Sequence, residues 1–233
     1  MVNPARTEPN VTEFVYVDDV SPSGTLRLAA LARIAGVLRH GGLAVLPTET
    51  GYMLAAVATN VDAVTDVFVT KRRSESNPVH VACASLSMAA RYADLTPMAA
   101  LLLGSLTPGP CTVVAAKTPL LPDRLVTVNE TVGIRIPDHP ATLQIIAEVD
   151  APLTATSVNE SGTAYRAPDR TVLAGLAWPA DQTVCVLDVG DTTPYSLAST
   201  LVRTTGNEPE ILRQGPITAE RIQEVLHTAI RHG

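Results

Sequence analysis

Apolar positions along the chain repeat with two different periods, and segments of the two kinds alternate. Helical spacing runs from about 25 to 39 and ends at a Gly-Gly pair, which suits the end of a helix. The predicted apolar stripe of this helix consists of Leu28, Leu31, Ile34, Ala35 and Leu38. Short β-branched runs, of which 43–46 is the first clear example, read as buried strands. This alternation predicts an α/β fold rather than an all-β barrel or a helical bundle.

The same reading along the rest of the chain predicts a series of further elements. Strands are expected at 14–17, 79–84, 111–116, 131–136, 153–156, 184–189, 197–202 and 210–212. Helices are expected at 62–70, 86–92, 97–103, 141–148 and 219–230. Asn60 and Thr218 precede two of these helices and are expected to cap them. We expect a mobile tail at 1–12 and a single domain at 13–233, because no stretch reads as a long linker.

Composition narrows the function classes. Hydrophobic residues make up 46% of the chain and aromatic residues only 3%, so the core must consist of Ala, Val, Leu and Ile, and stacking of a cofactor on aromatic rings is not expected. A net charge of -6 argues against strong direct binding of nucleic acid through a broad basic surface. No stretch has eighteen uninterrupted apolar residues and the first ten residues do not resemble a leader, so we expect a cytoplasmic protein without a membrane segment.

The cysteines do not suggest a structural or catalytic site. Cys83, Cys111 and Cys185 are odd in number, far apart and set among apolar residues. This pattern indicates neither a disulfide framework nor a zinc site. We expect reduced, packed side chains at all three positions.

Five short motifs carry the residues suited to anion chemistry. In chain order they are Pro47-Thr48-Glu49-Thr50, Lys71-Arg72-Arg73, Gly133-Ile134-Arg135-Ile136-Pro137, Ser157-Val158-Asn159-Glu160-Ser161-Gly162 and Leu212-Arg213-Gln214-Gly215. The first follows a buried strand, which is where α/β folds usually place ligands. Arg135 lies on an apolar strand, where an arginine is costly to bury unless an anion meets it. The hydroxyl and amide groups of the fourth motif can donate hydrogen bonds to anions.

Each motif by itself also has a plainer interpretation. The Lys-Arg-Arg cluster would suit an exposed helix end, where cations complement the helix dipole. Arg135 could point outward from an edge strand, and 157–162 could be an ordinary surface turn. Only the motifs taken together favour a site.

The order and approximate spacing of the five motifs resemble those of the YrdC-like threonylcarbamoyl-AMP synthases, from about Leu26 to Ile217. The resemblance, to the short single-domain form, implies a twisted mixed sheet flanked by helices with a concave anion-binding cavity. It implies an enzyme that makes L-threonylcarbamoyl-AMP from L-threonine, bicarbonate and ATP, with Mg²⁺ bound through the ATP phosphates, and that releases pyrophosphate. The product would pass to partner proteins that modify transfer RNA.

The resemblance also assigns residues. It implies that Lys71 and Arg73 clamp the ATP phosphates and act in catalysis. The ATP-binding set that it implies is Lys71, Arg73, Asn77, Thr131, Asn159 and Arg213. The set that it implies for the amino-acid substrate is Thr50, Arg135, Ser157 and Ser199.

Two departures from the family pattern leave other functions open. Gly51, Met53 and Ala55 replace a valine and two glycines in the loop expected after Thr50, which changes the bulk near the ligand. Ala82 stands where the family has a histidine that helps to hold threonine. One alternative is a diverged paralogue that forms a different carbamoyl adenylate in specialised metabolism. The other is a non-catalytic module that binds a nucleotide or RNA.

His80 lies two residues before Ala82 and on the same face of the expected strand. It could therefore take over part of the role of the missing histidine. A packed histidine inside the strand is the other interpretation. The residues leave this choice open.

Overall fold

A computed structural model describes residues 12–74, 77–123, 130–158, 170–190 and 194–230 of the chain, without the side chains of 170, 229 and 230. Its strands are β1 Glu13–Val17, β2 Leu43–Thr48, β3 Gly51–Ala55, β4 His80–Ala82, β5 Ala93–Asp94, β6 Cys111–Lys117, β7 Thr131–Arg135, β8 Leu153–Ser157, β9 Thr183–Leu187, β10 Thr200–Arg203 and β11 Glu210–Arg213. Its helices are α1 Leu28–Arg39, α2 Val61–Thr70, α3 Leu86–Tyr92, α4 Pro97–Leu106, α5 Pro140–Val149, α6 Arg170–Ala174 and α7 Ala219–Ile230.

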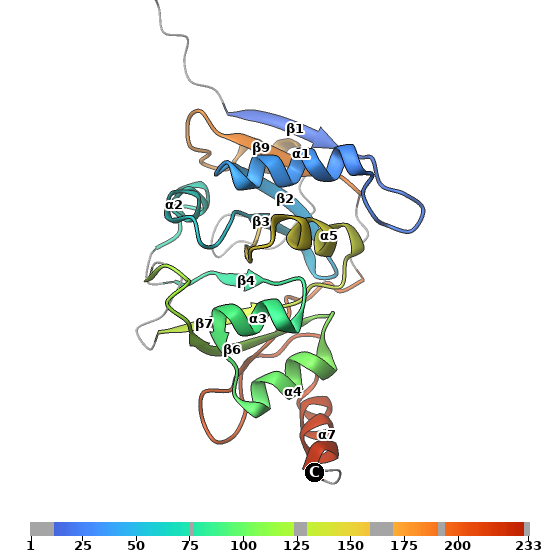
Figure 1. Ribbon diagram of the computed structural model, residues 1–233, viewed down its shortest axis with the longest axis vertical. Coiled ribbons are helices and arrows are strands. Elements are labelled where there is room, and N and C mark those ends of the chain that lie inside the picture. The colour runs from blue at the N-terminus through green and yellow to red at the C-terminus, as the bar shows by residue number, and fades with distance from the viewer. Residues whose placement is uncertain (1–11, 75–76, 124–129, 159–169, 191–193, 231–233) are drawn as a thin grey trace, which may run out of the picture.

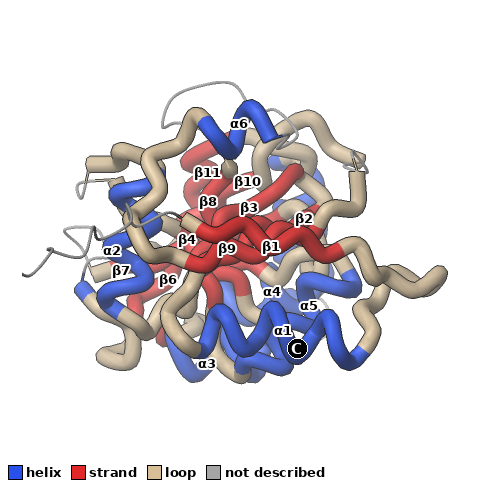
Figure 2. The backbone as a smooth tube through the Cα atoms, turned by 90° about the horizontal axis from the view of Figure 1, so that it is seen from above, coloured by secondary structure: helices blue, strands red, loops and turns tan. Residues whose placement is uncertain are grey.

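The strands form one mixed sheet in the order β1-β9-β2-β3-β8-β4-β7-β6-β10-β11, with β5 paired to β6. The sheet contains both parallel pairs, such as β4 with β7, and antiparallel pairs, such as β2 with β3. Helices α1, α3, α4 and α5 lie on one side of the strands and α6 on the other (Figures 1 and 2). The predicted α/β fold, a twisted mixed sheet flanked by helices, is therefore confirmed.

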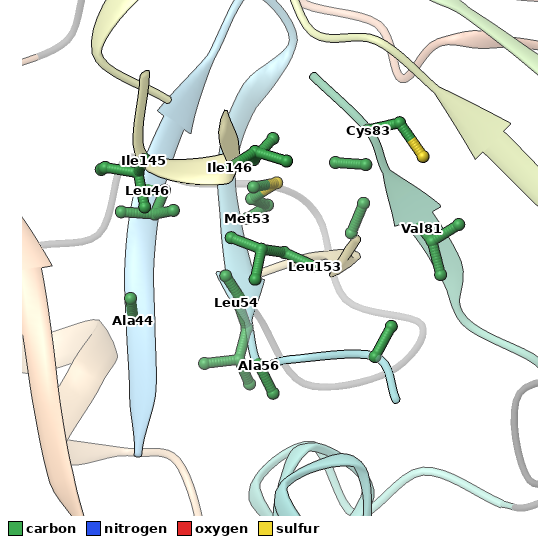
Figure 3. Close-up of a cluster of buried hydrophobic side chains, with 14 of the residues drawn as sticks. Ala44, Leu46, Met53, Leu54, Ala56, Val81, Cys83, Ile145, Ile146 and Leu153 are labelled. Atoms are coloured by element: carbon green, nitrogen blue, oxygen red, sulfur yellow. The ribbon is translucent and has the colours of Figure 1, made fainter. Parts of the chain in front are cut away.

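The core lies between the sheet and the helices that cover it. It is built almost entirely from aliphatic side chains, as the composition predicts. Leu46 and Ile145 are fully buried and lie side by side where α5 packs against β2 (Figure 3). At roughly 25 cal/mol per Å² of apolar surface removed from water, such burial is the main favourable term in folding.

The local signals explain most element boundaries. The Asn60 side chain accepts hydrogen bonds from the backbone N–H groups of Asp62 and Ala63, and the Thr218 hydroxyl accepts one from Arg221 N–H, so both predicted caps are confirmed. The helix expected from 25 begins only at Leu28. Leu28, the first residue of the helix, is 81% exposed and does not belong to the buried stripe, which begins at Ala30 and Leu31.

The largest difference from the expectation concerns the segment after Thr50. It was expected as a loop but forms β3, which pairs with β2 through a tight turn at Glu49 and Thr50. Apolar runs predict strands poorly when they are short and follow a turn directly, and Gly51 at the start weakens the pattern further. The hairpin places the first sequence motif at the end of β2 and in the turn that leads to β3.

The three cysteines are buried and are not joined in disulfides. Among the helices in the described part of the chain, none has the length and apolar character needed to cross a membrane.

Candidate active site

A cavity of about 160 Å³ lies across the middle of the sheet and collects side chains from strands that are far apart in sequence. The β2–β3 hairpin contributes Thr48 and Thr50, while β4 and β7 contribute His80 and Arg135. Arg73 follows α2, and Ser157 ends β8. Further lining residues come from the other half of the sheet, namely Thr112, Ser199 and Arg213. Residues of all five predicted motifs and the predicted Ser199 thus converge on one hollow.

The end of α2 directs the Lys71-Arg72-Arg73 motif. Arg72 has a positive φ of 47°, and the backbone N–H groups of Arg72 and Arg73 donate to the carbonyl oxygens of Val69 and Phe68. This is the left-handed turn that commonly ends helices. The turn reverses the chain, and the Arg73 side chain then donates from Nε to Asn77 O and from NH2 to Pro78 O, both at 2.8 Å. Arg73 is held in this way at the cavity wall.

Lys71 is buried rather than exposed. Only 1% of the residue is accessible, and its Nζ donates to the carbonyl oxygen of Ser157. Burial, assisted by the Arg73 guanidinium, lowers the pKa of Lys71 to about 8. The plainer interpretation of an exposed helix-end cation is wrong for this residue. Lys71 does not itself line the cavity, but it binds the backbone of Ser157, which does.

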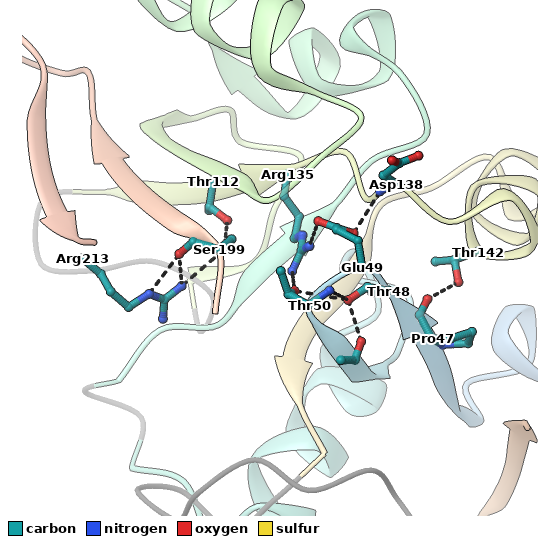
Figure 4. A network of polar contacts seen from close by, with 11 residues as sticks. Pro47, Thr48, Glu49, Thr50, Thr112, Arg135, Asp138, Thr142, Ser199 and Arg213 are labelled. Carbon is teal, nitrogen blue, oxygen red and sulfur yellow. Dashed lines mark hydrogen bonds and ion pairs between the residues drawn. The ribbon is translucent and has the colours of Figure 1, made fainter. Parts of the chain in front are cut away.

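Arg135 is buried on β7, with 8% of its surface exposed, so the outward-facing alternative is wrong. Its NH1 donates to Thr50 Oγ1 at 3.1 Å and its NH2 forms an ion pair with Glu49 Oε1 (Figure 4). Among the described side chains, its Nε is one of two buried polar atoms that have no hydrogen-bond partner. The arginine therefore meets an anion from the protein and also lines the cavity.

Arg213 is directed by the opposite half of the sheet. Its Nε and NH2 donate to Ser199 O at 3.1 and 2.9 Å, and the Ser199 hydroxyl lies 2.7 Å from Thr112 Oγ1 (Figure 4). Burial, with a smaller contribution from the Arg135 guanidinium, lowers the pKa of Arg213. The two arginines are thus close enough for their charges to interact across the cavity.

Gly215 holds this arrangement by its lack of a side chain. The Thr200 hydroxyl accepts from the N–H groups of Gly215 and Ile217 and fixes the segment after β11 against β10. A Cβ on Gly215 would lie 2.3 Å from Ala198 O and 2.4 Å from Thr200 N. The close approach explains why the arginine motif ends in glycine.

Gly215→Ala is therefore expected to lower the free energy of unfolding, by about 1–3 kcal/mol, because the atoms that the methyl group meets are backbone atoms that cannot rotate away. Gly36→Ala is the matched control. A Cβ at Gly36, inside α1, meets nothing within 4 Å and should raise stability by roughly 0.5–1 kcal/mol. Urea unfolding of both variants checks the prediction, and equal effects would contradict it.

His80 lines the cavity, so it is not only a packed strand residue, and its ring lies over Gly133. A Cβ on Gly133 would be 2.1 Å from His80 Nδ1. Burial and then the guanidinium groups of Arg213, Arg73 and Arg135 lower the pKa of His80 from 6.5 to about 3. The ring is therefore neutral near pH 7 and carries one donor and one acceptor nitrogen.

The lowered pKa of His80 predicts a specific pH dependence. Between pH 3 and 6.5 the unfolded chain binds a proton at this residue and the folded chain does not, so stability rises with pH across that window. His80→Gln should remove this contribution, and its loss of stability from pH 7 to pH 5 should be smaller than that of the wild type by on the order of 1–2 kcal/mol. Urea unfolding at the two pH values measures the difference. Equal losses of stability in the wild type and in His80→Gln would show that the pKa of His80 is not lowered in the folded protein.

The remaining predicted residues divide into three groups. Thr50, Ser157 and Ser199 line the cavity. Asn77 is exposed, and Thr131 lies at the far end of β7 from Arg135, so the structure does not bring these two to the cavity wall. Asn159, with the rest of the loop through Gly162, lies outside the described residues. The roles assigned to all of them stay predictions.

The departures from the family pattern have different structural meanings. Gly51 has a φ of 112°, which glycine adopts readily and valine does not, so the hairpin turn itself requires it. Met53 lines the cavity and adds bulk there. Ala55 and Ala82 are fully buried and are not among the lining residues, so neither side chain changes the wall of the cavity directly.

Sequence reasoning missed two residues of the site. Glu49 lies within the first motif, but a carboxylate is not expected in an anion site, so the sequence indicates no role for it. Thr112 lies in an apolar strand whose pattern gives no reason to single out a threonine. Only the pairing of β6 with β10 shows that its hydroxyl meets Ser199.

Within the described residues, no group of three or more histidine, cysteine, aspartate or glutamate side chains is placed to hold a metal ion. The lining side chains are cationic or neutral, and the carboxylate of Glu49 is already paired with Arg135. The wall is therefore suited to an anion.

Comparison with known proteins places these features in a family. The family Sua5_yciO_yrdC, described as telomere recombination, matches residues 36–215. The threonylcarbamoyl-AMP synthase of Bacillus subtilis (strain 168) is 34% identical over 198 residues, which cover 84% of this chain and 56% of that protein. The chain thus spans little more than half the length of this relative.

Solved structures agree with the fold. Sua5 of Pyrococcus abyssi, in a crystal structure of its complex with L-threonine, aligns with a TM-score of 0.78 at 28% identity, over 93% of this chain and 61% of that one. Escherichia coli YciO aligns with a TM-score of 0.76 over 91% of this chain and 100% of its own. At 20% identity the second likeness speaks for the fold alone.

Proposed function

This chain belongs to the Sua5/YciO/YrdC family, and we propose that it synthesises L-threonylcarbamoyl-AMP from L-threonine, bicarbonate and ATP, with release of pyrophosphate. The observation that carries the proposal is the convergence of Arg73, Arg135 and Arg213 on one small cavity beside several hydroxyl groups. Like-charged reactants need such fixed cations if they are to meet. The relatives named as threonylcarbamoyl-AMP synthases support the choice of reaction.

The substrates of the proposed reaction are negatively charged and repel one another, and the cations of this site would offset that repulsion. The nitrogen of L-threonine forms a bond to the carbon of bicarbonate as a C–O bond breaks and water and a proton leave, and an oxygen of the new carboxylate then forms a bond to the α-phosphorus of ATP. The bond from that phosphorus to the bridging oxygen breaks, and pyrophosphate leaves with the electron pair. Two carboxylates and a polyphosphate must therefore share one site. Positioning and charge stabilisation are the main requirements of such transfers.

The residues divide the task by position. We assign the L-threonine carboxylate to Arg135, beside the hydroxyl of Thr50 and near Ser157 and Ser199. We assign the ATP phosphates to Arg73 and Arg213, with Lys71 held behind the wall at Ser157. Asn77, Thr131 and Asn159 complete the proposed ATP set. The cavity holds only about 160 Å³, which is enough for the amino acid but small for a whole nucleotide, so the nucleotide would extend beyond it.

Mg²⁺ enters the proposal as part of the substrate MgATP. The cavity wall offers guanidinium and hydroxyl groups, and the carboxylate of Glu49, which does not line the cavity, is paired with Arg135. A magnesium ion would therefore be held by phosphate oxygens and water, which suits its preference for oxygen ligands and retained water. It would neutralise phosphate charge there.

The wider setting is also proposed. We place the enzyme in the cytoplasm as a single domain over 13–233, and we expect it to supply its adenylate to partner proteins that modify transfer RNA. The net charge of -6 agrees with a role for partners rather than direct capture of the RNA.

A second candidate is favoured by one observation. Met53 lines the cavity where the family pattern has glycine, so the amino-acid subsite has a different shape. A paralogue that carbamoylates and adenylates another amine would keep the same arginines. It would release pyrophosphate but not in response to threonine.

One experiment separates these possibilities. The protein is incubated with MgATP, bicarbonate and an equimolar mixture of amino acids, and the products are identified by mass spectrometry while pyrophosphate is measured. We expect threonylcarbamoyl-AMP and pyrophosphate release that depends on both threonine and bicarbonate. A carbamoyl adenylate of another amine would favour the paralogue, and nucleotide binding without pyrophosphate would refute both.

A further inference from the structure

Glu49 is a buried carboxylate inside a site that is otherwise built for anions. Only 3% of the residue is exposed, and it lies in the turn between β2 and β3. Its Oε1 pairs with Arg135 NH2, and its Oε2 accepts the backbone N–H of Asp138 at 2.9 Å (Figure 4). An ionised carboxylate is costly to bury unless it is paired in this way. Neither the proposed reaction nor the motif comparison gives this residue a role.

The contacts of Glu49 fix the direction of the Arg135 guanidinium. NH2 is held by Glu49 and NH1 by Thr50 Oγ1, both from the β2–β3 turn. Nε remains buried without a partner among the described residues. A guanidinium has five N–H donors in a rigid plane, so fixing two of its nitrogens also fixes where the remaining donors point. Because Arg135 lines the cavity, its guanidinium is presented there in one fixed orientation.

The surrounding charges explain why a counter-ion is needed. Arg73, Arg135 and Arg213 all line the cavity, and the positive charge of each lowers the pKa of His80. An arginine in this position is repelled by the other two. The carboxylate of Glu49 offsets that repulsion, and its bond to Asp138 N–H ties it to the segment that leads into α5. Arg135 is thereby kept in the cavity while no ligand is bound.

We propose that Glu49 is a positioning residue, which holds the Arg135 guanidinium in the orientation that binds the carboxylate of the amino-acid substrate. The inference rests on the proposed function for the identity of that substrate. Glu49 acts only through Arg135, since it is not among the residues that line the cavity. Its loss should affect binding of the amino acid far more than binding of ATP.

The test compares Glu49→Gln with Glu148→Gln. Glu148 pairs with Arg39 on the surface, at 3.1 Å and with both side chains more than 40% exposed, so it controls for loss of an ion pair in general. Glu49→Gln removes the negative charge and replaces one acceptor oxygen by an NH₂ donor. The side chain can then no longer accept hydrogen bonds from both Arg135 and Asp138 in the present arrangement. We expect its KM for L-threonine to rise by roughly 10–100-fold, with KM for ATP within about 2-fold of wild type. Glu148→Gln should match the wild type.

A second readout does not depend on the reaction. The arginine Nε–Hε signals are recorded by ¹⁵N NMR, and the Arg135 signal is assigned by its absence in Arg135→Lys. In the wild type we expect an ordered Arg135 side chain, and in Glu49→Gln a mobile one. If Arg135 stays ordered in Glu49→Gln, or if KM for threonine does not change, the positioning role is refuted.

Failure of the proposed function gives a different pattern. In that case the wild type releases no pyrophosphate with threonine, while the NMR comparison still decides whether Glu49 orders Arg135. Should Glu49→Gln not fold, Glu49→Asp replaces it. This variant keeps the charge but withdraws the carboxylate by one methylene group, and the same loss of Arg135 order is expected.

Discussion

Arg73→Ala is expected to lower the rate of pyrophosphate release by at least about 100-fold, the loss typical when one fixed donor to a developing charge is removed. The Arg73 guanidinium lines the cavity and is fixed by two backbone carbonyl oxygens, those of Asn77 and Pro78. A cation held in this way needs little reorganisation when the phosphate charge shifts during the reaction. Steady-state assays with saturating threonine and varied MgATP measure the effect.

Arg72→Ala is the matched control for this variant. It removes a neighbouring cation of the same motif, and Arg72 is not among the residues that line the cavity. We expect its turnover to stay within about 3-fold of the wild type, because an exposed charge near a site acts weakly through water. Equal losses in the two variants would mean that the general charge of the motif, rather than the placement of Arg73, supports the reaction.

Arg135→Ala is expected to lower the free energy of unfolding by about 3–5 kcal/mol. Among the described residues, the variant leaves buried Glu49 with the Asp138 N–H as its remaining hydrogen-bond donor, so most of the cost of desolvating its charge is uncompensated. Urea unfolding at pH 7 measures the loss. Replacing both members of the pair, in Glu49→Gln/Arg135→Ala, should recover part of it because the buried charge is then absent.

The surface pair Arg203 and Glu210 provides the comparison. These side chains are 42% and 60% exposed, and the pair joins β10 to β11 at 2.7 Å. Arg203→Ala should cost no more than about 1 kcal/mol, since water screens both charges. A loss in Arg135→Ala as small as in Arg203→Ala would show that Glu49 is not desolvated in the folded protein.

The five motifs could be recognised from the sequence because each is continuous along the chain. The Lys71 motif shows its helix end directly, whereas the apolar residues on either side of Arg135 left burial and an outward-facing edge position as alternatives. The partner of Arg135 could not be predicted. Glu49 is 86 residues away, and nothing in the local pattern of either residue indicates that they meet.

The same limit explains the misplaced β3. A strand of five residues after a two-residue turn has no period long enough to distinguish it from a loop. Its partner β8 lies about a hundred residues further on, so the hydrogen bonds that define it are not local. This pairing places Met53 at the cavity wall. From the sequence alone, Met53 indicated only a larger side chain than the glycine of the family pattern.

The amino-acid sequence by itself determined the alternation of helices and strands, the aliphatic core and the residue types suited to an anion site, because periodicity and side-chain chemistry are local properties. Tertiary structure alone decided which of those residues meet. Strand pairing brought Arg135 and Arg213 to one cavity, the turn after α2 added Arg73, Asn77 and Thr131 stayed away from its wall, and Glu49 came to lie against Arg135. Such contacts depend on sheet order and register, which arise from the packing of the whole chain.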